Sequence, residues 1–98
     1  MNINKQSQQA NTTIEVEVIG PLATKLKISK TAFSVKEKLT VEKLLSLLAN
    51  KFTNIFLNTK PKPGILVFIN GRDHRVYLKD ELLGDKLKVD IIQVFHGG

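Results

Sequence analysis

Between Pro63-Gly64 and Asn70-Gly71 the sequence reads Ile65-Leu66-Val67-Phe68-Ile69, with an apolar side chain at every position. Successive side chains of a strand point to opposite faces of its sheet, so a strand that is apolar throughout needs a cover on each face and is typical of the middle of a sheet. Residues 65–69 therefore predict a strand in the interior of a sheet. The segment 61–64 contains two prolines and a glycine, and it can lie neither in a helix nor inside a strand ladder.

Other segments show the pattern of half-buried strands. From Thr13 to Gly20, apolar residues alternate with glutamates, and Gly20-Pro21 ends this strand. We expect a second strand at 32–36, a short return strand at 75–78 after the Asn70-Gly71 turn, and a last strand at 89–95. Residues 22–28 fit either a wide hairpin loop or a strand extension. Residues 53–64 are predicted to be a connection with a small apolar anchor, formed by Ile55, Phe56 and Leu57.

A helix is predicted over residues 40–52. Thr40 is a suitable N-cap, and Glu42 in the first turn complements the helix dipole. Because one side of this helix is polar, the helix must lie on a surface rather than inside the core. One apolar stripe follows about three turns: Val41, Leu44, Leu45, Leu48 and Phe52.

The order of elements predicts an α+β fold of the ubiquitin-like β-grasp type. The order is strand, strand, helix, strand, short strand, strand, and one helix across a mixed sheet of four or five strands covers one apolar face. A chain of 98 residues forms one domain. We place the domain at 13–98 and interpret the polar segment 1–12 as a mobile tail.

Composition argues against several classes of function. The net charge is +6, but the lysines are scattered and no aromatic residues are interleaved with them, which favours plain solubility over a base-stacking surface. The chain has no cysteine, and His74 and His96 have no clustered carboxylates, so we predict no metal site and no catalytic residues. No apolar run reaches the roughly 20 residues that cross a bilayer, and the N-terminus lacks a signal-peptide core. We therefore expect a cytoplasmic protein that does not contact membranes.

The last two residues, Gly97 and Gly98, carry the strongest chemical signal. They follow a predicted strand, so they should project from a rigid sheet edge. Glycine has no Cβ, which lets an extended tail enter a narrow channel. A carboxylate is a poor electrophile, but a partner enzyme that uses ATP could convert it to an acyl donor.

On these features the chain resembles the ubiquitin-related modifier family, which is allied to the molybdopterin-synthase small subunit and the thiazole-pathway sulfur carrier. The resemblance runs from about Thr13 to Gly98. It is strongest in residues 63–70 and in Phe95-His96-Gly97-Gly98, and the Gly84-Asp85 turn is similar to that of the two sulfur carriers.

The resemblance implies a carrier that is not itself an enzyme. An E1-like adenylating enzyme would activate Gly98 with ATP, and Gly97 would provide clearance. A sulfurtransferase would then help to form a thiocarboxylate, for tRNA-thiolation enzymes or cofactor synthesis, or the carboxyl would be joined to lysines of target proteins. The resemblance implies no bound cofactor, since ATP is used by the activating partner, and we expect a monomer.

A docking surface is predicted on the sheet face away from the helix. If Asp90 points to water, Ile92 and Val94 share its face beside Leu66 or Phe68. An uncovered apolar patch usually marks a binding surface. The alternative is that the patch is small or that residues 53–62 fold over it. Phe95 and His96 complete the predicted partner-binding set.

Two other functions are compatible with the same sequence. A basic module of this fold could bind RNA or protein through its lysines, and its RNA affinity would then fall strongly with salt. A dedicated subunit of a molybdopterin-synthase-type complex would insert its tail permanently into one large partner.

Overall fold

The computed structural model describes residues 11–95. The tail predicted for residues 1–10, and the roles predicted for His96, Gly97 and Gly98, lie outside the described residues. The helices and strands are β1 (Thr12–Ile19), α1 (Pro21–Leu26), β2 (Lys30–Val35), α2 (Val41–Lys51), β3 (Phe56–Leu57), β4 (Lys60–Pro61), β5 (Ile65–Ile69), β6 (Arg72–Asp73) and β7 (Lys86–Gln93), with 3-10 turns η2 (Thr53–Ile55) and η3 (His74–Val76).

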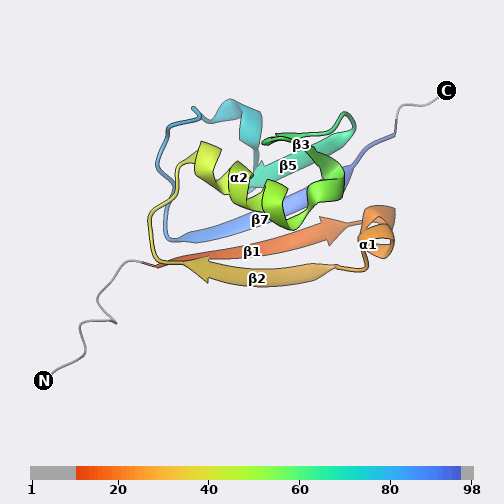
Figure 1. Ribbon diagram of the computed structural model, residues 1–98, viewed down its shortest axis with the longest axis horizontal. Coiled ribbons are helices and arrows are strands. Elements are labelled where there is room, and N and C mark those ends of the chain that lie inside the picture. Colours follow the sequence, from red (N-terminus) through yellow and green to blue (C-terminus); the bar gives the residue numbers. More distant parts are fainter. Residues whose placement is uncertain (1–10, 96–98) are drawn as a thin grey trace, which may run out of the picture.

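The strands form a five-stranded mixed sheet in the order β2-β1-β7-β5-β6, and β3 pairs with β4 in a separate hairpin. Strand β7 runs parallel to β1 and antiparallel to β5, so the last strand lies in the middle of the sheet. Helix α2 packs across one face of this sheet, while the shorter α1 lies at the end of β1 (Figure 1). The predicted ubiquitin-like β-grasp is confirmed.

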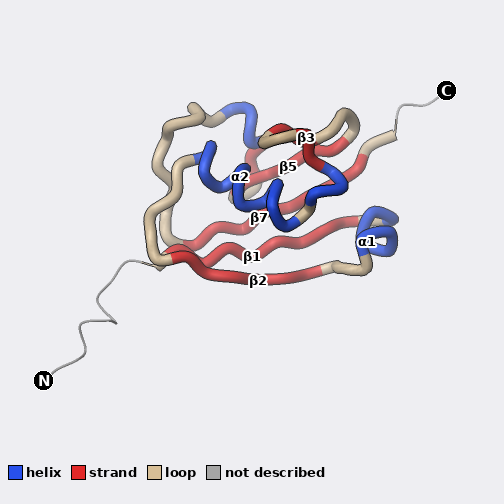
Figure 2. The backbone as a smooth tube through the Cα atoms, viewed as in Figure 1, coloured by secondary structure: helices blue, strands red, loops and turns tan. Residues whose placement is uncertain are grey.

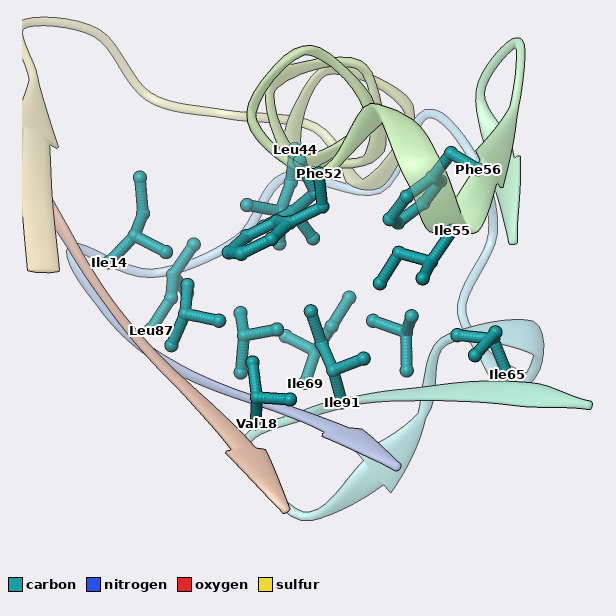
Figure 3. Close-up of a cluster of buried hydrophobic side chains, with 14 of the residues drawn as sticks. Ile14, Val18, Leu44, Phe52, Ile55, Phe56, Ile65, Ile69, Leu87 and Ile91 are labelled. Atoms are coloured by element: carbon teal, nitrogen blue, oxygen red, sulfur yellow. The ribbon is translucent and has the colours of Figure 1, made fainter. Parts of the chain in front are cut away.

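The core lies between α2 and the sheet. Figure 3 shows Leu44 and Phe52 pointing from the helix side toward Ile69 and Ile91 on the strands. Each such side chain, when fully buried, contributes roughly 1.5–3 kcal/mol. The helix begins as predicted, because the Thr40 hydroxyl accepts a hydrogen bond from the backbone N–H of Lys43 at 3.1 Å.

Residues 22–28 contradict both predicted alternatives, since most of them belong to α1. Pro21 occupies the first turn, where its fixed φ suits a helix and its missing N–H costs nothing. Leu22 is buried, which ties the turn to the core. Lys27 ends the helix in the left-handed conformation with φ 60°.

The return strand predicted at 75–78 is also wrong. Asn70 and Gly71 both have positive φ, as a two-residue type I′ turn requires, and they pair Ile69 directly with Arg72. The strand therefore follows at once as β6. It ends where the Asp73 carboxylate accepts the backbone N–H of Arg75 at 2.9 Å and begins η3.

Strand β7 covers Lys86–Gln93, three residues earlier at its start than the predicted 89–95, because it pairs with β1 from Thr13 onward. Strand β1 begins at Thr12, inside the segment assigned to the polar tail. The Thr12 side chain is buried and its hydroxyl donates to the Glu37 carbonyl at 2.7 Å.

The connection at 53–64 is anchored by two residues rather than three. Ile55 and Phe56 are buried in the core on the α2 side of the sheet (Figure 3). Leu57 is 57% exposed. It pairs with Lys60 in the β3–β4 hairpin, and strand alternation turns its side chain away from the side that Phe56 buries.

Candidate functional site

The sheet face opposite α2 carries the predicted apolar patch. Strand register places Leu66 beside Ile92, and Ile92 beside Ile19 of β1, so three apolar side chains form one row. Phe68 lies in the next row, opposite Asp90. Leu66, Phe68 and Ile92 are each half-buried, while Ile19 is 39% exposed. We define the outer patch as Ile19, Leu66, Phe68, Ile92 and Val94.

The outer patch is accessible from solvent in the part of the chain that the structure describes. All helices of the described residues lie on one side of the sheet or at its end in the backbone view (Figure 2). The connection 53–62 does not cover the patch, because its apolar anchors Ile55 and Phe56 pack into the opposite face (Figure 3). The alternative in which this loop folds over the patch is therefore wrong.

Ile19 belongs to the outer patch, although the predicted partner-binding set did not include it. The signal was present, because Ile19 continues the alternation of Glu15 and Glu17, which face outward.

A charged network borders the outer patch. The Lys88 ammonium donates to Asp90 at 2.7 Å and to Glu17 at 3.1 Å. Both hydrogen bonds raise the pKa of Lys88, and the bond to Asp90 has the larger effect. The network therefore separates the apolar end of this face, toward Gln93, from its polar end, toward Lys86.

Glycine 64 shapes the point where the chain leaves the sheet. The backbone N–H of Val94 donates to the Gly64 carbonyl at 2.8 Å, which extends the β5–β7 ladder by one bond. Gly64 has φ +88°, and a Cβ at this position would lie 3.2 Å from the Val94 carbonyl oxygen. A side chain here would thus be strained as well as crowded. Val94 is 38% exposed and Phe95 is 72% exposed, so both predicted partner-binding residues are accessible.

A groove of about 730 Å³ lies beside this exit. It is bounded by the β3–β4 connection, the first turns of α2, η3 and the edge of β5. Leu66 and Val94 line both the groove and the outer patch, so the two surfaces are continuous. The other lining residues are Glu42, Leu45, Thr59, Lys60, Pro61, Lys62, Pro63, Gly64, Ile65, Asp73, His74, Arg75 and Lys79.

Asp73 and Arg75 form a two-point ion pair on the groove wall. The Arg75 guanidinium donates to both Asp73 carboxylate oxygens, at 3.0 and 2.8 Å. This contact lowers the pKa of Asp73 to about 2. Burial lowers the pKa of the neighbouring His74, which favours its neutral form.

The shifted pKa predicts how Asp73→Asn alters stability with pH. The pKa of Asp73 is about 2 in the folded state, below its usual value of 3.8. The ionised carboxylate therefore stabilises the fold above about pH 4, and this contribution is lost as the pH falls to about 2. Asn retains an acceptor for the Arg75 backbone N–H but removes the charge. We expect the variant to have a slightly lower free energy of unfolding than the unmodified protein at pH 7, measured by urea unfolding. This difference should disappear between pH 4 and pH 2. If the difference in free energy of unfolding persisted below pH 2, it would not come from the charge of Asp73.

Within residues 11–95 no group of three or more His, Cys, Asp or Glu side chains could hold a metal ion. Of the helices described, none is long and apolar enough to cross a membrane.

Comparison with known families connects this geometry to a class of protein. The family model described as Urm1 (Ubiquitin related modifier) matches residues 12–98, which includes the whole sheet, the outer patch and the terminal Gly-Gly. The chain belongs to the ubiquitin-related modifier family. It is thus a ubiquitin-like protein of the modifier and sulfur-carrier group, whose members are not themselves enzymes.

Solved structures show the same fold as this ubiquitin-related modifier. Urm1 from Sulfolobus solfataricus is 27% identical with a TM-score of 0.60, covering 82% of this chain and 99% of the other. SAMP1 from Haloferax volcanii is 18% identical with a TM-score of 0.64, covering 88% and 99%. A putative molybdopterin converting factor subunit 1 from Pyrococcus furiosus is 15% identical with a TM-score of 0.60, covering 86% and 99%. A search of curated proteins finds no significant match.

Proposed function

We propose that the Gly98 carboxylate is activated in trans by an E1-like adenylating enzyme. A carboxylate oxygen attacks the α-phosphate of ATP, which forms the acyl adenylate and releases pyrophosphate. A sulfide equivalent then displaces AMP and leaves a thiocarboxylate, or a lysine amine displaces it and leaves an isopeptide bond. The single observation that carries the proposal is the family match, which extends through Gly97 and Gly98.

The outer patch supports a specific docking mode. The central strand β7 ends beside Leu66, Ile92 and Val94, and the C-terminal residues follow directly. A partner that covers these three residues would therefore lie next to the C-terminal end of the described chain. Leu66, Phe68, Ile92, Val94, Phe95 and His96 would make this contact. Apolar residues of this kind, at the centre of an interface, supply most of its binding energy.

The remaining partners follow from the same chemistry. A sulfurtransferase would supply sulfur to the adenylate, and tRNA-thiolation enzymes, cofactor synthesis or target-protein lysines would consume the activated tail. The protein would act as a monomer in the cytoplasm and bind no cofactor, with ATP held by the activating enzyme.

Intact mass spectrometry tests the proposal. The protein is isolated from its native cells, then incubated with ATP, a sulfur donor and cell extract. We expect a mass gain equal to the replacement of one oxygen by sulfur, located at Gly98, and conjugates if lysines are also targets. A terminus that remains a plain carboxylate, with no conjugates, would refute activation of Gly98.

A second candidate function is a small subunit of a molybdopterin-synthase-type complex. The fold similarity to the Pyrococcus furiosus subunit favours it. Such a subunit would copurify with one large partner at fixed stoichiometry, whereas a carrier would be recovered mainly free.

A further inference from the structure

The groove beside the chain exit has a basic rim. Lys60 and Lys62 line it from the segment at β4, and Lys79 and Arg75 line it from the segment that includes η3 and the residues after it. Arg75 is neutralised by Asp73, but within residues 11–95 none of the three lysines forms an ion pair. Glu42 is the other carboxylate of the lining. The groove therefore holds an excess of positive charge that no partner within the described residues satisfies.

The interior of the groove is aliphatic. Leu45 of α2, Pro61 of β4 and Ile65 of β5 line it together with Leu66 and Val94. No Phe, Tyr or Trp side chain contributes to the lining, and the planar guanidinium of Arg75 is engaged by Asp73, so the groove lacks the row of aromatic side chains on which successive nucleic-acid bases stack. An aliphatic interior with a lysine rim suits a peptide that carries both apolar and acidic side chains.

Charge is unevenly distributed around the chain exit. No acidic residue occurs between Val18 and Lys36 or between Lys43 and Arg72, the segments that contain the end of β1, α1, β2, most of α2, the β3–β4 connection and all of β5. Four acidic residues, Glu37, Asp80, Glu81 and Asp85, belong to the connections that precede α2 and β7. An acidic partner surface would thus be attracted to the end of the molecule from which the tail leaves.

We propose that the groove is a second docking site, which receives an acidic segment of the activating enzyme while the outer patch and the tail engage the rest of that enzyme. The segment is extended, places Asp or Glu against Lys60, Lys62 and Lys79, and seats an apolar side chain between Leu45 and Ile65. The inference rests on the proposed activation of Gly98. Because Leu66 and Val94 belong to both the groove and the outer patch, one partner surface could cover the two sites together.

A matched pair of charge reversals tests this second docking site. Lys60→Glu/Lys62→Glu alters the groove rim, and Lys36→Glu/Lys38→Glu alters an exposed loop next to Glu37. Both variants change two exposed lysines that are two residues apart, and both lower the net charge equally. Adenylation kinetics are measured with the purified activating enzyme at low and high salt, and thermal unfolding confirms that both variants fold.

We expect KM for the groove variant to rise about tenfold or more at low salt, with kcat at saturation unchanged and the difference shrinking at high salt. The loop variant should change KM by less than about twofold. Equal effects of the two variants would overturn the groove site, because only net charge would then matter. An unchanged KM combined with weaker binding of the groove variant to bulk tRNA would overturn it in favour of a nucleic-acid partner. If the unmodified chain is not adenylated at all, the proposed activation itself fails.

Discussion

Deletion of Gly98 alone is expected to leave the fold intact and to reduce activation of the C-terminus at least about 100-fold. The variant still ends in a glycine carboxylate, that of Gly97, so the chemistry of the terminal group is retained. The position of this group changes, because one residue of extended chain spans about 3.5 Å and the shortened tail reaches less far by that distance. A displacement of even 1 Å at a reacting centre can cost about 100-fold in rate. The measurement is the rate of ATP-dependent pyrophosphate release with the activating enzyme.

The matched control removes residues 2–10, which precede the segment that the family model matches. This variant is expected to be activated within about twofold of the full chain. Strand β7 ends at Gln93, five positions before Gly98, and β1 begins at Thr12, after the residues removed from the control, so neither deletion should lower the unfolding temperature appreciably. If the chain without Gly98 were activated as fast as the control, the reacting group would not be the Gly98 carboxylate.

Most of the fold could be predicted because local pattern and tertiary packing agree. The stripe through Leu44 and Leu48 has helical spacing, and within residues 11–95 it packs on the inner face of the sheet. The alternation in β1 and the apolar run in β5 each predicted a strand, and both strands have a neighbour on either side in the sheet. Where each element buries one clear face, sequence alone determines its type.

The errors fall where a short element depends on its surroundings. Helix α1 has six residues, too few to form alone, and it is held by the burial of Leu22 against the end of the sheet. The short return strand lies before the predicted 75–78, because the turn at Asn70-Gly71 pairs Ile69 directly with Arg72. The Asp73 side chain then accepts the backbone N–H of Arg75 and ends the strand. Neither contact leaves a periodic signal in the sequence.

The two candidate surfaces differ in how far the sequence could predict them. The outer patch follows from strand parity, since Leu66, Phe68 and Ile92 had to share the face of Asp90 once their strands paired. The groove is assembled from four separate segments, from Glu42 to Val94, and its lysines looked scattered along the chain. Only the packing of the connection and η3 around the β5 edge brings them together.

Ile92→Asp is expected to raise KM for the activating enzyme by roughly 30-fold to 1,000-fold, the range that follows from losing an interface hot spot of about 2–4 kcal/mol. Ile92 lies between Ile19 and Leu66 on the outer patch, so a carboxylate there would be desolvated by any apolar surface that covers the patch. The fold should tolerate the change, because Ile92 faces outward and its neighbour Ile91 fills the core. KM should rise while kcat at saturation is largely retained.

Leu82→Asp provides the matched control for that variant. Leu82 is an apolar side chain that is 67% exposed in the connection before β7, away from the outer patch, and its replacement removes the same kind of side chain and adds the same charge. We expect its KM to remain within about twofold, as for most exposed positions. Unfolding temperatures of both variants separate a docking defect from a folding defect. Should Ile92→Asp behave like Leu82→Asp, the outer patch would not be the docking surface, and recognition would have to depend on the tail and the groove alone.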